Sequence, residues 1–368
     1  MNSEGERQRP KKGGKAKRRI IAAAVFLLVT AALIFLLQAL LVPKYMSFPY
    51  DGALVREYYD SVPEHDVIFL GDCEFYECVN PAVIWSEYGI PVYVRGSSQQ
   101  LIWDSYYFLL ETLKYEKPKA VVFNAVEMKI GRVQHEEYTR LTLDGMRLSK
   151  YKLAAAKMSL TEGESLASYV FPIIRYHERW KELGEEDFRY MFRSDTVSYN
   201  GYLMMTGIRA KTSTVDPPAL ADYSFPDICV EYLDKIRLLC RDNGIEFIIL
   251  KAPTDTWHYP WHDEWEAWMS DYAGANGVRY YSAIRSASEI GTDWTTDSYD
   301  GGDHMNYIGA EKVSRWFGAI LRDEFDLPDR RAGGEGGLSA GALAEWAALT
   351  DRYAAAAAEA GKAAENAG

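Results

Sequence analysis

The stretch "VIFLGDCEFYECVNP", residues 67–81, decides the fold. The four apolar residues Val67–Leu70 predict a buried strand, and Gly71 and Asp72 predict a tight turn that leads into a helix. An apolar strand that turns directly into a helix is typical of a parallel sheet covered on both faces. Cys73 lies at this turn, where the chain bends most sharply.

The same alternation of strand and helix continues along the chain. It is interrupted by a long irregular segment at about 128–225, rich in Tyr and Arg, which would cover a cleft or form a surface for a partner. The pattern predicts an α/β fold with a doubly wound, mainly parallel sheet. Further strands are expected from residues 90, 119, 245 and 278, and helices at 81–88, 101–118, 226–242 and 308–322.

The N-terminal region predicts a membrane anchor. Residues 1–19 form a basic head, and residues 20–42 are 23 residues without a charge, long enough as a helix to cross a bilayer. The run ends in "VPKY" and lacks the small-residue exit of a cleaved signal peptide. We therefore expect a single-pass protein at the cell membrane, with a cytoplasmic N-terminus and an extracytoplasmic main domain. A buried core helix is the alternative.

The remaining organisation follows from composition. Residues 43–327 form the main domain, and the Gly- and Ala-rich tail 328–368 is expected to be a linker and a marginal helix outside the core. The formal net charge of −12 persists despite the basic head, so the main domain is acidic and nucleic acid is not an expected partner. Cys229 and Cys240 fall on one predicted helix and cannot pair with each other.

Four residues follow the predicted strands at the sheet edge where ligands bind in open α/β folds. Cys73 would be a nucleophile at a helix start, and His304 would transfer its proton. The backbone N–H groups of Cys73 and Gly96 and the side-chain amide of Asn124 would form an oxyanion hole. Each has a plainer interpretation: a buried thiol for Cys73, and strand-end packing for Gly96 and Asn124.

The quoted blocks resemble those of SGNH (GDSL-type) hydrolases over roughly residues 64–325. "FLGDCEFYECVNP" is similar to the first block, "VRGSSQ" to the Gly block, "VVFNAVE" to the Asn block, and "DGGDHMNYIGAEKVS" to the last block, where Asp and His precede a helix. The resemblance implies a three-layer α/β/α, flavodoxin-like fold preceded by one transmembrane helix. It departs from the family pattern at Cys73, where the family has Ser.

The resemblance also implies how His304 is supported. In the family an Asp stands three residues before the His, whereas Asp300 stands four before His304 and Asp303 is adjacent to it. Gly301 and Gly302 could absorb the extra residue. Asp300 is therefore the preferred partner, and Asp303 is the alternative acid.

Membrane-anchored members of the family suggest the biological setting. This chain resembles those members, which are similar to accessory proteins of teichoic-acid D-alanylation and polysaccharide O-acetylation. The resemblance implies that the chain is an esterase or acyltransferase acting on O-acyl groups of a cell-envelope polymer. The alternative is a catalytically weak or inactive accessory protein. Such a protein would partner a membrane-bound O-acyltransferase, or bind a glycan such as an envelope polysaccharide or teichoic acid.

No metal and no cofactor are expected. His258 and His262 have the spacing of ligands on one helix, but Pro260 lies between them. Four tryptophans nearby predict a packing stripe, or aromatic surfaces for sugar rings: Trp257, Trp261, Trp265 and Trp268.

Overall fold

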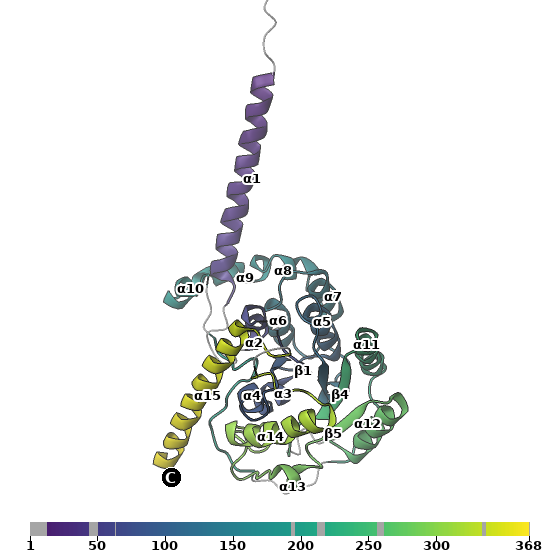
Figure 1. Cartoon of the computed structure of the whole chain (residues 1–368). Helices are drawn as coiled ribbons and strands as arrows, with labels where there is room; N and C mark the ends of the chain where they lie inside the picture. Colours follow the sequence, from purple (N-terminus) through teal and green to yellow (C-terminus); the bar gives the residue numbers. More distant parts are fainter. Residues whose placement is uncertain are drawn as a thin grey trace, which may run out of the picture.

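The strands form one parallel sheet in the computed structural model, which describes residues 13–43, 51–62, 64–192, 196–211, 218–255, 261–332 and 336–367 (Figure 1). The strand order is β2-β1-β3-β4-β5, and every neighbouring pair is parallel. This is the flavodoxin-like order of a doubly wound fold, and it confirms the predicted fold class. The strands are β1 (Val67–Gly71), β2 (Val92–Gly96), β3 (Ala120–Asn124), β4 (Glu246–Lys251) and β5 (Arg279–Ser282).

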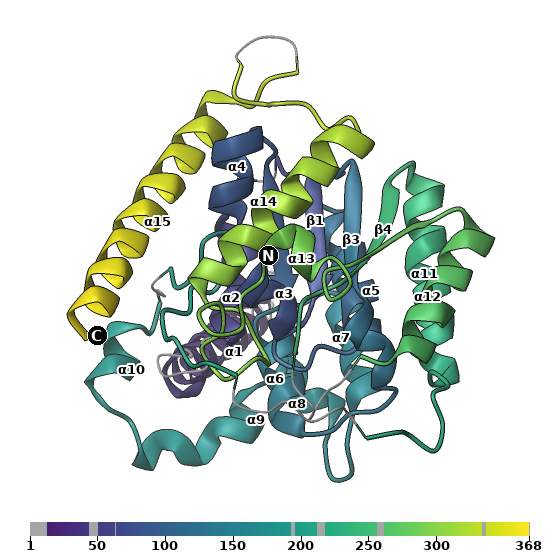
Figure 2. The same cartoon turned by 90° about the horizontal axis from the view of Figure 1, so that it is seen from below.

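Both faces of the sheet are covered by helices, which makes the three layers (Figure 2). Along β1, Ile68 and Leu70 pack into one core with α5, α7, α11 and α12, while Val67 and Phe69 pack into a second core with α3, α4 and α14. Successive side chains of a strand point to opposite faces, so a strand buried on both faces must be apolar throughout. All five residues of β1 are buried.

The helices of the two layers have the following bounds. They are α3 (Cys73–Cys78), α4 (Pro81–Tyr88), α5 (Ile102–Thr112), α7 (Lys150–Ser159), α11 (Asp227–Asn243), α12 (Asp263–Asn276) and α14 (Tyr307–Glu324). Two shorter helices are α2 (Asp51–Glu57), which precedes this set, and α13 (Ala287–Ile290), which lies between α12 and α14.

The segment expected to be irregular is largely helical in its first two thirds. Besides α7 it contains η2 (Ala125–Lys129) at its start, α6 (Glu136–Asp144), α8 (Leu166–Val170), α9 (Ile173–Tyr176), η3 (His177–Lys181) and α10 (Glu185–Arg189). Most of these helices span one or two turns, too short for the apolar period to stand out in the sequence. Tertiary contacts stabilise these helices instead. For example, the buried Arg140 donates a hydrogen bond of 2.7 Å to the Ser168 side chain.

The first helix, α1 (Gly13–Leu41), contains a span from Gly14 to Leu41 that is long and apolar enough to cross a membrane. None of its most apolar window is buried by the rest of the chain. The predicted apolar helix is therefore present, and it is not a core helix of the domain. It projects away from the domain in Figure 1.

The tail differs from the expectation that it lies outside the core. Helix α15 (Ala340–Ala367) packs its first half along α4. Trp346 is 4% exposed and stacks on Trp85 with ring centroids 4.9 Å apart. The alanines suggested a weak, isolated helix, but Leu338, Trp346 and Tyr353 supply an apolar stripe that only the folded domain can cover.

Candidate active site

Cys73 is the first residue of α3, immediately after the turn that ends β1. Asp72 caps this helix, because its side chain accepts a hydrogen bond of 3.1 Å from the Glu74 N–H. As the first helical residue, Cys73 has a backbone N–H without a partner inside the helix. β1 lies between β2 and β3, so the thiol stands where the winding of the sheet reverses, which is the ligand-binding edge in such folds.

His304 lies on the loop before α14, and the start of that helix fixes the loop. The Asn306 side chain accepts hydrogen bonds from the N–H groups of Ile308 and Gly309, and its amide donates to the carbonyls of Gly207 and Thr296. The loop after β4 holds the other side, since the Asp255 N–H donates to the Gly302 carbonyl at 2.7 Å. The position of His304 is thus set by three separate parts of the chain.

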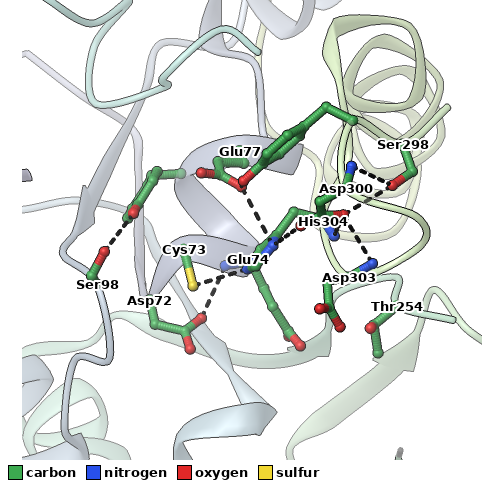
Figure 3. Close-up of polar contacts among 12 residues, drawn as sticks. Asp72, Cys73, Glu74, Glu77, Ser98, Thr254, Ser298, Asp300, Asp303 and His304 are labelled. Atoms are coloured by element: carbon green, nitrogen blue, oxygen red, sulfur yellow. Dashed lines mark hydrogen bonds and ion pairs between the residues drawn. The ribbon is translucent and has the colours of Figure 1, made fainter. Parts of the chain in front are cut away.

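The structure brings Cys73, His304 and Asp300 together in one chain of contacts (Figure 3). The His304 Nε2 atom lies 3.1 Å from the Cys73 sulfur, although the two residues are 231 positions apart. On the other side of the ring, Nδ1 lies 2.7 Å from Asp300 Oδ2. This is the order nucleophile, base and orienting carboxylate that acyl transfer uses.

Of the two candidate carboxylates, Asp300 contacts the ring. Its Oδ1 atom also accepts from the N–H groups of Asp303 and His304, while the Asp303 side chain lies toward Thr254 (Figure 3). Gly301 and Gly302 have φ angles of +95° and +111°, a region that only glycine adopts readily. They accommodate the extra residue between the Asp and the His.

Ser298 supports this loop and was missed by the sequence reasoning. Its hydroxyl donates to Asp300 Oδ1 at 3.0 Å and accepts from the N–H groups of Asp300, Gly301 and Gly302. A serine two residues before the Asp was the only signal in the sequence, and serines at turns are common.

Gly96 and Asn124, at the ends of β2 and β3, border the turn that carries Cys73. A Cβ atom on Gly96 would lie 2.8 Å from the Gly71 carbonyl oxygen, so only glycine fits against the turn. The Asn124 amide donates to Asp72 Oδ1 at 3.1 Å and to Glu74 Oε2 at 3.4 Å. Each of its two hydrogens therefore has a carboxylate acceptor, and an oxyanion role would require one of these bonds to break.

Burial and neighbouring charges shift the pKa values of the reacting groups. Burial and the neighbouring Asp72 raise the pKa of the Cys73 thiol to about 12, although His304 opposes the shift. Burial lowers the pKa of His304, but the Cys73 sulfur, Asp300 and Glu77 outweigh it and hold that pKa well above its usual value. Burial and Glu74 raise the pKa of Asp72 to about 7. The raised pKa of Cys73 favours the protonated thiol over the thiolate.

Two further residues of the site, Glu77 and Tyr299, are distant from each other in the sequence. Glu77, one turn along α3, lies 3.9 Å from His304 Nδ1 and accepts a hydrogen bond of 3.0 Å from the Tyr299 hydroxyl. The Tyr299 ring stacks on the His304 ring with centroids 6.1 Å apart. Glu77 lies in the first quoted block and Tyr299 directly precedes the last one, but their meeting across 222 positions has no signal in the sequence.

A buried ion pair lies beneath the turn. Lys251, at the end of β4, is 1% exposed, and its ammonium lies 2.7 Å from Glu74 Oε2 and 2.8 Å from the Ala252 carbonyl. Because Glu74 also accepts from Asn124, the pair links the ends of β3, β4 and α3. An isolated strand-end lysine gives no sequence signal for this role.

The structure describes only part of the histidine pair and of the tryptophan group. His258 and Trp257 lie outside the described residues, while His262 packs against Tyr223 and Trp265. Within the described ranges no group of three His, Cys, Asp or Glu residues has the geometry to hold a metal ion. Trp265 is 7% exposed and belongs to the core, against which Trp261 and Trp268 also pack.

All four cysteines are free thiols, and three of them are buried. Cys229 and Cys240 both lie on α11, as the sequence predicted, and point into the core between α11 and the sheet. Cys73 is the exception, with its side chain partly exposed at the site.

Comparisons with known proteins give remote structural likenesses alone. No family model matches the chain, and no curated protein matches it significantly. An acylhydrolase, so described, from Bacteroides fragilis is 11% identical over 73% of this chain and 94% of its own, with a TM-score of 0.36. A GDSL-like lipase from Bacteroides thetaiotaomicron is 12% identical over 75% of this chain and 98% of its own, with a TM-score of 0.34. The chain is an α/β protein with a parallel sheet, and it is remotely similar to GDSL-like lipase and acylhydrolase structures.

Proposed function

We propose that this chain is a membrane-anchored esterase or acyltransferase that acts on O-acyl groups of a cell-envelope polymer. The observation that carries the proposal is the contact series Cys73–His304–Asp300, with separations of 3.1 and 2.7 Å at the ligand-binding edge of the sheet. The substrate class and the membrane setting rest on the apolar N-terminal helix and on the motif resemblance.

In the proposed mechanism the Cys73 sulfur attacks the acyl carbonyl while His304 Nε2 accepts the thiol proton. Asp300 holds the ring by its Nδ1–H and stabilises the imidazolium that forms. When the C–O bond of the ester breaks, His304 returns the proton to the departing alcohol, leaving an acyl thioester on Cys73. Water, or an acceptor hydroxyl, then attacks the thioester with His304 again acting as base.

The oxyanion of each tetrahedral intermediate needs donors at the turn. The Cys73 N–H and the backbone of Gly96 lie there, and Asn124 would join them on release from Asp72 or Glu74. Loss of one such donor typically lowers the rate about a hundredfold or more.

The proposed topology follows the charges. The basic residues before the apolar span favour a cytoplasmic N-terminus, which places the domain outside the membrane, beside envelope polymers. Protease added to intact cells should digest the domain, and digestion only after the membrane is opened would contradict this orientation.

The acidic surroundings of the thiol favour a second candidate, a non-catalytic accessory protein. Burial and Asp72 raise the Cys73 pKa to about 12, which disfavours the reactive thiolate. In this case the domain would bind a glycan or partner a membrane-bound O-acyltransferase, and the triad would be a remnant.

The deciding experiment measures hydrolysis of 4-nitrophenyl acetate by the full chain in detergent between pH 7 and 10. Cys73→Ala and His304→Ala should each abolish the activity, whereas Cys240→Ala, which alters a buried thiol away from the site, should leave it unchanged. Mass spectrometry should detect acetyl on Cys73, removable by hydroxylamine. Equal rates for wild type and both site variants would exclude the catalytic proposal and leave the accessory one.

A further inference from the structure

Exposed apolar side chains gather in one short part of the chain, residues 171–192. Five large ones are between 49% and 65% exposed there, whereas the rest of the described chain outside α1 has five more that are spread over four different regions. The gathered side chains are Phe171, Ile174, Trp180, Phe188 and Phe192. Single exposed apolar residues are ordinary on a protein surface, but a cluster of them indicates a contact with something apolar.

This cluster adjoins the foot of the apolar N-terminal helix. Figure 1 shows α8, α9 and α10 side by side where α1 meets the domain, and α1 contacts α9, η3 and α10. Phe192 stacks on Phe35 of α1 with ring centroids 6.4 Å apart. The Arg179 guanidinium donates to the carbonyl of Leu41, the last residue of α1, at 2.7 Å.

The contact with Phe35 gives the depth of the cluster. Phe35 precedes the end of α1 by six residues, which corresponds to about 9 Å of helix rise. A ring that touches Phe35 therefore lies beside the apolar part of the span and not beyond its end. If α1 crosses a bilayer, Phe192 is at the level of the lipid.

We propose that residues 166–192 form a membrane-contact surface that lies on the bilayer, with Trp180, Phe188 and Phe192 in its interfacial layer. This inference rests on the proposed anchor α1. Aromatic side chains are the residues that favour the interface between water and hydrocarbon, and short helices can lie in its plane.

Two ion pairs are formed within this surface. Arg179 pairs with Asp187 at 2.7 Å, and Lys181 pairs with Glu178 at 3.4 Å. The desolvation of a charge near an apolar layer costs less free energy when the charge is paired than when it is single. The continuity of the surface with α1 favours lipid as the occupant over a second copy of the chain or another protein.

The consequence is a second point of attachment. A helix joined to the domain by a flexible link would let the domain tumble, whereas contact along α8–α10 fixes its orientation. The candidate active site would then work at a constant distance from the membrane surface.

Fluorescent labelling of the full chain in lipid nanodiscs tests the proposal. A Cys73→Ala background removes the partly exposed thiol, and single cysteines replace Trp180 or Phe188 for an environment-sensitive NBD label. Two matched sites frame them: Leu28, in the middle of α1, and Asp271, an exposed residue of α12 on a part of the domain away from α1 (Figure 1). Lipids that carry doxyl quenchers near the headgroup or deep in the chains report the depth.

The labels at 180 and 188 should be quenched several-fold by the shallow quencher, the label at 28 by the deep one, and the label at 271 by neither. Quenching at 28 without quenching at 180 and 188 would overturn the membrane-contact surface and leave the anchor intact. A blue-shifted emission at 180 and 188 without lipid quenching would also overturn it, and would indicate a protein in contact. No quenching at 28 would refute the anchor and the surface together.

Discussion

The reactivity of the Cys73 thiol is the property that best tests the electrostatics of the site. Burial and Asp72 raise its pKa to about 12. At pH 8 about one thiol in ten thousand is then ionised, against roughly a quarter for a free cysteine with a pKa near 8.5. The thiolate is the species that reacts with iodoacetamide. The smaller ionised fraction alone should therefore lower the alkylation rate of Cys73 by about three orders of magnitude.

A more basic thiolate is a better nucleophile, and this offsets part of the loss. With a Brønsted slope of about 0.45, the higher pKa returns roughly 1.5 logarithmic units. The net expectation is that Cys73 is alkylated about fifty to a hundred times more slowly than a free thiol at pH 8. The rate should continue to rise by about tenfold per pH unit up to pH 10.

The assay follows carbamidomethylation of the Cys73 peptide by mass spectrometry, with a free cysteine peptide in the same tube as reference. Asp72→Asn keeps an oxygen that can accept from the Glu74 N–H but removes the charge, so it should accelerate alkylation. Alkylation at pH 7 as fast as that of the reference, and constant from pH 6 to 9, would refute the reasoning. It would indicate a thiolate–imidazolium pair, a ready nucleophile at neutral pH.

Three other predictions concern the site and its support. Asp300→Asn should lower the rate of ester hydrolysis at least a hundredfold, because the His304 ring loses the carboxylate that orients it. The steady-state rate constant kcat measures this loss. Lys251→Met leaves Glu74 buried without a counter-charge and should lower the free energy of unfolding by about 3 kcal/mol, measured by thermal unfolding. The matched control Lys235→Met, at a partly exposed lysine, should change it by less than about 0.5 kcal/mol. Trp346→Ala should detach α15 and expose it to limited proteolysis, because about 3 kcal/mol of packing is lost; unchanged digestion would contradict the observed docking of the tail.

The pH dependence of activity follows from the same charges. His304 must be neutral to accept the thiol proton, and its pKa is raised well above the usual value. Activity should therefore increase as the pH rises above neutrality, and a maximum below pH 7 would contradict the proposed role of the base.

The sequence alone determined the order of the strands and of the helices that cover the sheet outside the segment 128–225. Short apolar runs such as Val67–Leu70 that end in turn residues indicate strands covered on both faces, and the helices between them favour a parallel sheet. It also placed Cys73, Gly96, Asn124 and His304 at strand ends or on the final loop, because these positions are local features of the chain.

The tertiary structure alone decided which of these residues meet and what surrounds them. The separation of 3.1 Å between Cys73 and His304 depends on how α14 packs on the sheet. The carboxylates that occupy the Asn124 amide and the docking of α15 through Trp346 are contacts between distant segments. Local patterns record periodicity and turn chemistry, whereas pKa shifts and docked helices arise from desolvation and charge in the folded state, which no short stretch of sequence contains.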